Sequence, residues 1–172
     1  MKKTLVAIIL GSDSDLNIMS EAARVLEEFN IPYEITVSSA HRSPELTTKN
    51  IQRYQKAGVK VIIAGAGLAA HLAGSVAAHF PLPVIGVPLK SGALAGIDSL
   101  YSTVQMPPGI PVATVGIDNA KNAGLLAIQI LATADRKLEK KLLEYKRTMA
   151  DSVEKKGVKL EKLGWKNYLP EK

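Results

Sequence analysis

The adjacent residues His41 and Arg42 form the most chemically informative pair in the sequence. An imidazole titrates near neutral pH and can transfer protons, while a guanidinium stays charged and can bind a phosphate bidentately. Strand-forming residues precede the pair at 33–37, and Ser43-Pro44 after it is typical of a helix start. The pair is therefore expected in a βα loop, at the edge of a parallel sheet where such folds bind ligands. The alternative is a histidine that only caps the helix, beside a solvated arginine.

A second candidate is the segment Gly-Ser-Asp-Ser-Asp at 11–15, which opens a helix after the first apolar run. The free N–H groups of a helix start attract phosphate, and the hydroxyls of Ser12 and Ser14 add donors. Asp15 would be a poor neighbour for phosphate but a good acceptor for ribose hydroxyls. An ordinary helix cap explains the segment equally well, and a magnesium site on Asp13 and Asp15 is a weaker alternative.

Small residues dominate two further loops. At 64–70 they allow a ligand to approach the backbone, although the resemblance to a dinucleotide fingerprint is superficial because the turn follows the third strand. His71 is expected about one turn into the next helix, where packing in the core is more common than contact with a ligand. The loop at 88–96 either covers a substrate or only permits close helix packing.

Strand-like and helical patterns alternate along the chain and predict five βα units. The expected strands cover 4–10, 33–37, 60–64, 84–87 and 112–115, and the expected helices cover 14–29, 44–57, 68–79, 98–104, 119–132 and 136–153. This order predicts a single domain over 1–172, a three-layer α/β fold with a mostly parallel five-stranded sheet of flavodoxin-like type and an added C-terminal helix. The basic tail at 155–172 is expected to fray or to dock on a neighbouring subunit.

Composition limits the class of protein. The chain has 172 residues, of which 47% are hydrophobic, enough for a core without staples. The lack of cysteine excludes thiol nucleophiles and Cys-ligated metals and fits a reducing, cytoplasmic location. The apolar run at 4–10 is too short for a membrane span. The net charge of +6 lies largely after Arg136, among Lys and Glu at helical spacing, so neither nucleic acid nor a membrane is an expected partner.

Other reaction classes fit poorly. No Gly-x-Ser-x-Gly elbow is present, which disfavours hydrolysis by an activated serine. The three histidines are too scattered to suggest a zinc site. The remaining candidates describe phosphate binding, one proton-transfer group and a pocket with small apolar walls.

Five segments together closely resemble the PurE family of purine biosynthesis. They are Gly-Ser-Asp-Ser-Asp (11–15), Ser-Ala-His-Arg-Ser-Pro (39–44), Ala-Gly-Ala-Gly-Leu-Ala-Ala-His-Leu-Ala-Gly (64–74), Gly-Val-Pro-Leu-Lys-Ser (86–91) and Asp-Ser-Leu-Tyr-Ser-Thr-Val-Gln-Met-Pro-Pro-Gly-Ile-Pro-Val (98–112). The segments stand in the family's order and spacing, and the resemblance covers nearly everything to about residue 136.

The resemblance implies a class I N5-carboxyaminoimidazole ribonucleotide mutase. Such an enzyme moves a carboxyl group from N5 to C4 of its substrate and gives 4-carboxy-5-aminoimidazole ribonucleotide, without metal, ATP or biotin. In the family's second class, which carboxylates aminoimidazole ribonucleotide directly, Lys stands in place of Arg42 and the Ala-Ala-His that ends at His71 is missing. That carboxylase is the nearest alternative, and a non-catalytic nucleotide-binding or phosphoryl-binding module is the other.

By position, the resemblance also implies roles for individual residues. His41 would be the catalytic acid and base, and Ser12, Ser14 and Asp15 would hold the ribose 5-phosphate end. The remaining substrate-binding positions are Ser39, Arg42, Ala66, Gly67, His71 and Leu72, the first two at the phosphate and the others around carbon dioxide and the carboxylate.

Two positions depart from the family's commonest pattern. Leu68 stands where Gly usually follows Gly-Ala-Gly, and Ala73 stands where Pro usually follows His-Leu. Neither change removes an acid, a base or a phosphate contact, so the implied activity is retained. The implied partners are a small nucleotide substrate and further copies of the chain in a homo-octamer.

Overall fold

Five parallel strands form the central sheet of the computed structural model, which describes residues 3–169. In chain order they are β1 (Val6–Leu10), β2 (Tyr33–Val37), β3 (Val61–Gly67), β4 (Val84–Leu89) and β5 (Ala113–Thr114). Their spatial order is β2-β1-β3-β4-β5. The chain moves outward in one direction from β1 to β2 and in the other from β3 onward, so a topological switch point lies between β1 and β3. The predicted flavodoxin-like sheet is confirmed.

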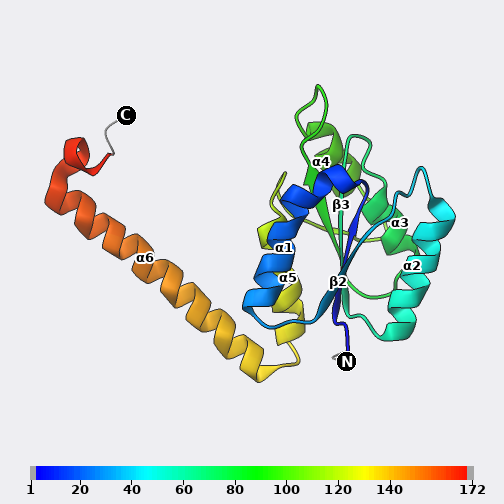
Figure 1. Cartoon of the computed structure of the whole chain (residues 1–172), viewed down its shortest axis with the longest axis horizontal. Coiled ribbons are helices and arrows are strands. Elements are labelled where there is room, and N and C mark those ends of the chain that lie inside the picture. Colours follow the sequence, from blue (N-terminus) through cyan, green and yellow to red (C-terminus); the bar gives the residue numbers. More distant parts are fainter. Residues whose placement is uncertain (1–2, 170–172) are drawn as a thin grey trace. The chain divides into compact units, whose positions relative to one another are not determined.

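Helices cover both faces of this sheet (Figure 1). They are η1 (Asp13–Asp15), α1 (Leu16–Glu28), α2 (Pro44–Ala57), α3 (Leu72–His79), α4 (Ile97–Val104) and α5 (Ala120–Ala132). Helices α1 and α5 lie on one face, while α2 and α3 lie on the other. Thr103 of α4 packs beside Ala73 of α3 at Gly86 of β4, which places α4 on the same face as α2 and α3.

The position of β1 and β3 in the core explains why their sequences are almost entirely apolar. All five residues of β1 and the first five of β3 are buried, as expected for central parallel strands covered on both faces. On the face of α2 and α3, Ile9 and Ile62 pack in one cluster with Tyr54 and Val76. The sheet is therefore a rigid platform, and the loops at its carboxyl edge are held by buried strands.

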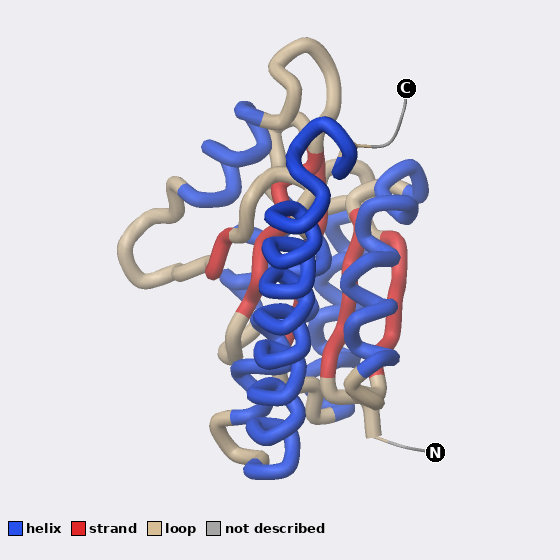
Figure 2. Tube along the Cα trace, turned by 90° about the vertical axis from the view of Figure 1, so that its left-hand side faces the viewer, coloured by secondary structure: helices blue, strands red, loops and turns tan. Residues whose placement is uncertain are grey.

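The chain divides into two compact units, residues 1–131 and residues 132–172. The second unit consists mainly of α6 (Arg136–Tyr168), the long helix seen in Figure 2. Asp135 begins it as N-cap and accepts hydrogen bonds from the N–H groups of Lys137 and Leu138. Gly164, with φ of 69° and ψ of 156°, interrupts the helical geometry before its last turn. No helix within residues 3–169 is long and apolar enough to cross a membrane.

Several predicted boundaries differ from the structure. The helix expected at 68–79 begins only at Leu72, and the strand expected at 112–115 covers two residues, Ala113–Thr114. The expected fraying of 155–172 is wrong for 155–168, which continue α6 well past residue 153, while 170–172 lie outside the described residues. Docking of this tail on a neighbouring subunit stays a prediction.

Candidate active site

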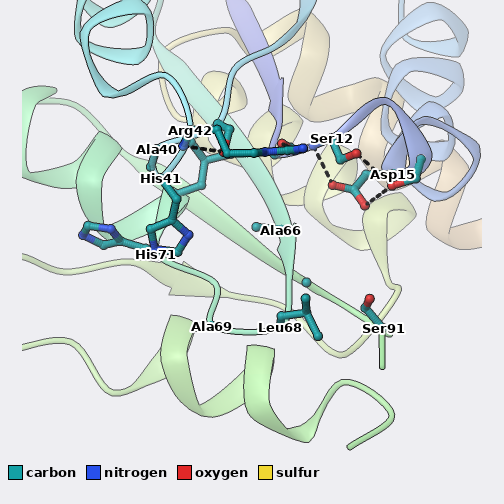
Figure 3. Close-up of a pocket in the computed structure, with 15 residues that line it drawn as sticks. Ser12, Asp15, Ala40, His41, Arg42, Ala66, Leu68, Ala69, His71 and Ser91 are labelled. Atoms are coloured by element: carbon teal, nitrogen blue, oxygen red, sulfur yellow. Dashed lines mark hydrogen bonds between the residues drawn. The ribbon is translucent and has the colours of Figure 1, made fainter. Parts of the chain in front are cut away.

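One pocket of about 510 Å³ lies at the carboxyl edge of the sheet (Figure 3). Every site residue predicted from the sequence lines it: Ser12, Ser14, Asp15, Ser39, His41, Arg42, Ala66, Gly67, His71 and Leu72. These residues come from the segments after β1 and β2, from the last two residues of β3 and from the segment that leads into the first residue of α3, and the three strands are neighbours in the sheet. The pocket therefore sits at the switch point, where open parallel sheets bind their ligands.

The turn after β1 presents two hydroxyl groups side by side. Ser14 Oγ lies 3.0 Å from Ser12 Oγ, and the N–H of Ser14 donates to Asp13 Oδ1 over 3.1 Å. The N–H of Ser12 donates to Asp15 Oδ2 over 3.0 Å, which ties the two ends of the turn together. The hydroxyl pair is thus held at the start of a helical segment, an arrangement suited to a phosphate group.

Asp15 lies half-buried in this turn. Burial raises the pKa of its carboxyl above the ordinary value of 3.8, against the opposing effects of the Ser12 and Ser14 hydrogen bonds and of the Arg42 charge. One oxygen accepts from Ser12, and the carboxylate as a whole lines the pocket. A carboxylate with acceptor capacity left over can receive hydrogen bonds from sugar hydroxyls.

Replacing Asp15 by Asn is expected to leave the protein at least as stable as wild type at pH 7. An amide oxygen can still accept from Ser12 N–H but carries no charge to bury. Because the folded-state pKa is raised, the ionised form is penalised above that pKa, and the penalty disappears as the pH falls through it toward 3.8. The advantage of the variant should therefore shrink in acid, as thermal melts at pH 7 and about pH 4 would measure. A variant that is less stable at pH 7, with a deficit that grows with pH, would contradict this.

Arg42 links the loop after β2 to the turn after β1. Its Nη2 donates to the carbonyl oxygen of Gly11 over 3.0 Å, and its Nε lies 3.4 Å from Ser39 Oγ. Figure 3 shows the guanidinium extended toward Ser12 and Asp15. Within the described residues Nη1 has no protein hydrogen-bond partner, so this group remains available to an anion beside the two serine hydroxyls.

The loop at 39–43 is closed on itself before α2 begins. Ser43 N–H donates to Ser39 O over 2.8 Å, and Ser39 N–H donates to Ser43 Oγ over 3.2 Å. Beneath the loop, the buried hydroxyls of Ser38 and Thr47 lie 2.7 Å apart. With Pro44 at the first helical position, as predicted, these contacts fix the backbone that carries His41.

His41 and His71 lie side by side at the wall of the pocket. Their ring centroids are 5.2 Å apart with an interplanar angle of 31°, and both side chains are exposed. His71 lines the pocket, as the family resemblance implied, and the alternative of a histidine packed inside a helix is wrong. It is instead the N-cap of α3, because Leu68 adopts a positive φ of 54° and its carbonyl accepts from Ala70 N–H over 2.8 Å, so the chain turns before the helix starts.

Further residues line the pocket that the sequence analysis did not name individually as site residues. Among them are Ala40, Leu68, Ala69 and Ser91. Ser91 follows β4, and a Cβ placed at Gly67 would lie only 2.9 Å from Ser91 Cβ, so glycine is required for this approach. Ser91 could have been predicted from the strand order, because β4 is the next neighbour of β3 in the sheet and its carboxyl end lies at the same edge.

The arrangement of carboxylate and imidazole groups also bears on the magnesium site considered from the sequence. Among residues 3–169, no three His, Asp or Glu side chains gather as metal ligands, so Asp13 and Asp15 have no third partner. His79 lies outside the pocket, with Nδ1 2.9 Å from the carbonyl oxygen of Ser75 in its own helix, as expected of a structural histidine.

The fold and the pocket define the class: a parallel α/β protein with a small-molecule site at its switch point, equipped with anion-binding and proton-transfer groups. The family model described as AIR carboxylase matches residues 5–152. The chain therefore belongs to the AIR carboxylase family, the PurE family.

Close relatives agree with this membership. The chain is 58% identical to an N5-carboxyaminoimidazole ribonucleotide mutase of Pyrococcus horikoshii over 99% of this chain and 96% of the relative. It is 54% identical to the protein of the same name from Thermotoga maritima, over 97% and 98%. The crystal structure of Treponema denticola PurE matches with a TM-score of 0.84 and 32% identity, over 91% of this chain and 98% of that one.

Proposed function

We propose that the chain is an isomerase that converts N5-carboxyaminoimidazole ribonucleotide to 4-carboxy-5-aminoimidazole ribonucleotide in purine biosynthesis. The main supporting observation is that every residue to which the family resemblance assigns a role in this reaction lines one pocket. Near full-length identity of 54–58% to proteins named as this mutase supports the assignment. Phosphoribosylaminoimidazole carboxylase of Schizosaccharomyces pombe is 53% identical, but this chain spans only 30% of that longer protein.

Substrate binding falls to the groups around the turn after β1. Ser12, Ser14 and Ser39 donate hydroxyl hydrogen bonds to the 5-phosphate, and the free Nη1 of Arg42 adds a charge-assisted one. Asp15 accepts from the ribose hydroxyls. The geometry supports this assignment, because Arg42, Ser12 and Ser14 line the same part of the pocket and can contact one phosphate group together.

The reaction then needs one proton-transfer group and a place to hold carbon dioxide. The bond between N5 and the carboxyl carbon breaks, its electron pair stays on N5, and N5 takes a proton from His41. Carbon C4 attacks carbon dioxide, and His41 removes the proton that C4 carried, so the base returns to its starting state. Ala66, Gly67 and Leu72 offer small apolar walls for carbon dioxide, and His71 can donate to its carboxylate product.

We further propose that residues 1–172 act as one catalytic domain, that the protein assembles as a homo-octamer, and that it works in the cytoplasm without a nucleic-acid or membrane partner. Side chains exposed on α4 support self-association. Ile97, Tyr101 and Val104 are 47%, 61% and 48% exposed and recur at i, i+4 and i+7 along this helix, and apolar side chains that share one exposed helix face are typical of an interface.

The test is turnover in degassed buffer without added bicarbonate, followed by mass spectrometry of the product. The mutase converts N5-carboxyaminoimidazole ribonucleotide under these conditions. Activity only on aminoimidazole ribonucleotide, and only with added bicarbonate, would identify the direct carboxylase. Binding of both nucleotides without turnover of either would identify a binding module and overturn the proposal.

A further inference from the structure

Leu68 holds an unfavourable backbone conformation at the wall of the pocket. Its φ of 54° lies in the left-handed region, which a bulky side chain rarely adopts. Such a conformation persists only where the surrounding structure imposes it, and it is concentrated at functional sites. The hydrogen bond from Ala70 N–H to Leu68 O fixes the turn, so the side chain of Leu68 is aimed by its backbone.

That side chain touches the loop at residues 90–96. A Cβ at Gly92 would lie only 2.9 Å from Leu68 Cδ2, so the methyl group packs directly on the Gly92 backbone. Gly92 has a φ of 60° and belongs to a loop that follows β4. Leu68 is still 53% exposed and lines the pocket, so it packs on the loop with one side and borders the cavity with another.

The loop at 90–96 is anchored by hydrogen bonds at its ends, and its tip is held by the Leu68 contact and by a hydrogen bond from Ile97 N–H to the Leu94 carbonyl oxygen over 3.0 Å. Ser99 Oγ lies 2.9 Å from both the Leu89 and the Gly96 carbonyl oxygens, and Lys90 N–H donates to Asp118 Oδ1 over 2.8 Å. Between these anchors residues 91–95 are exposed. The contact of Leu68 with Gly92 therefore affects the distance between the tip of this loop and the pocket.

We propose that Leu68 is a positioning residue, which holds the 90–96 loop against the turn after β3 and keeps carbon dioxide in the pocket between its release from N5 and its capture by C4. The proposal rests on the mutase function proposed above. Carbon dioxide has no charge by which a protein can grip it, so its retention depends on closing the exits. Leu68 closes one exit with an apolar side chain, and its loop contact keeps that exit narrow.

The experiment measures how much carbon dioxide exchanges with the solvent in each turnover. Unlabelled N5-carboxyaminoimidazole ribonucleotide reacts with excess enzyme in buffer containing ¹³C-bicarbonate and carbonic anhydrase, and the ¹³C content of the C4 carboxyl is read by mass spectrometry. We expect the labelled fraction to rise about fivefold or more in Leu68→Ala and Leu68→Gly compared with wild type. Leu94→Ala is the matched control, because Leu94 lies in the same loop, is 61% exposed and does not line the pocket.

The labelled fraction reports the partition of carbon dioxide between escape and capture by C4, so the single-turnover rate measured in the same reaction separates faster escape from slower capture. A labelled fraction equal to that of wild type in both Leu68 variants would overturn the proposal, as would an equal rise in Leu94→Ala. Wild type without any turnover would instead overturn the mutase function itself.

A second measurement covers variants that are too slow to assay. Hydrogen exchange of the amides at 91–95, without substrate, should quicken about threefold or more in both Leu68 variants and stay unchanged in Leu94→Ala outside its own position. Leu68→Gly also relieves the strained φ, so its melting temperature should stay within about 3 °C of wild type. Unchanged exchange at 91–95 would overturn the proposal, whatever the activity.

Discussion

Replacement of His41 by Asn is expected to lower the turnover of N5-carboxyaminoimidazole ribonucleotide by about 10²–10⁴-fold, the range for loss of a positioned acid and base. Asn is similar in size and keeps hydrogen-bonding capacity, but it cannot carry the proton between N5 and C4. The phosphate and ribose contacts come from other side chains, those of the turn after β1 and of Ser39 and Arg42, so substrate affinity should stay within about threefold of wild type. Single-turnover rates and calorimetric titration measure the two quantities separately.

His71→Asn is the matched control for this experiment, because the two rings are only 5.2 Å apart and both line the pocket. If His41 carries the proton and His71 only contacts the carboxylate, the His71 variant should lose far less turnover than the His41 variant. Equal losses in the two variants would show that the pair acts as a unit. Turnover above about one tenth of wild type in His41→Asn would rule out His41 as the proton-transfer group.

Replacement of Arg42 by Gln is expected to raise KM by about 10–100-fold, with a smaller change in kcat, because a hydrogen bond to a charged group contributes about 1.5–3 kcal/mol. The phosphate lies far from the reacting bonds of the substrate, so its contacts act on bound substrate and transition state alike. Inhibition by ribose 5-phosphate should weaken by a similar factor. Steady-state kinetics at two salt concentrations would measure these changes.

Arg42→Lys separates charge from geometry. A lysine restores the positive charge but not the planar fork that reaches Gly11 O and leaves Nη1 free. Its KM should fall between those of wild type and Arg42→Gln. A fall in kcat with KM unchanged in either variant would move Arg42 from phosphate binding to the chemical step.

The sequence predicted the platform of the fold well because buried strands have a simple signature. The apolar run of β1 and the paired signals around the loop at 39–43 are local, and both were confirmed. The ten predicted site residues meet in one pocket because each lies at or after the carboxyl end of a strand, and the topology rules limit where those strands lie in the sheet. Their individual roles stay predictions.

The errors arose where the structure depends on contacts distant in sequence or on an unusual backbone angle. The leucine side chain at 68 gives no sign of a left-handed backbone, so α3 was predicted to begin four residues early and His71 was expected about one turn inside the helix instead of at its N-cap. Ser91 enters the pocket only because β4 pairs with β3. The charged composition after residue 153 suggested a tail, whereas its Lys and Glu residues continue the helix as far as Tyr168.

The residues that line the pocket are encoded in one continuous part of the gene. Every described residue that lines the pocket lies within residues 11–91, at or after the carboxyl ends of the first four strands. A recombination crossover placed after Ser91 would thus carry the whole set of chemical groups in one fragment. The region beyond it, apart from Ser99 and Asp118, which anchor the loop at 90–96, can vary in sequence without removing a residue that lines the pocket.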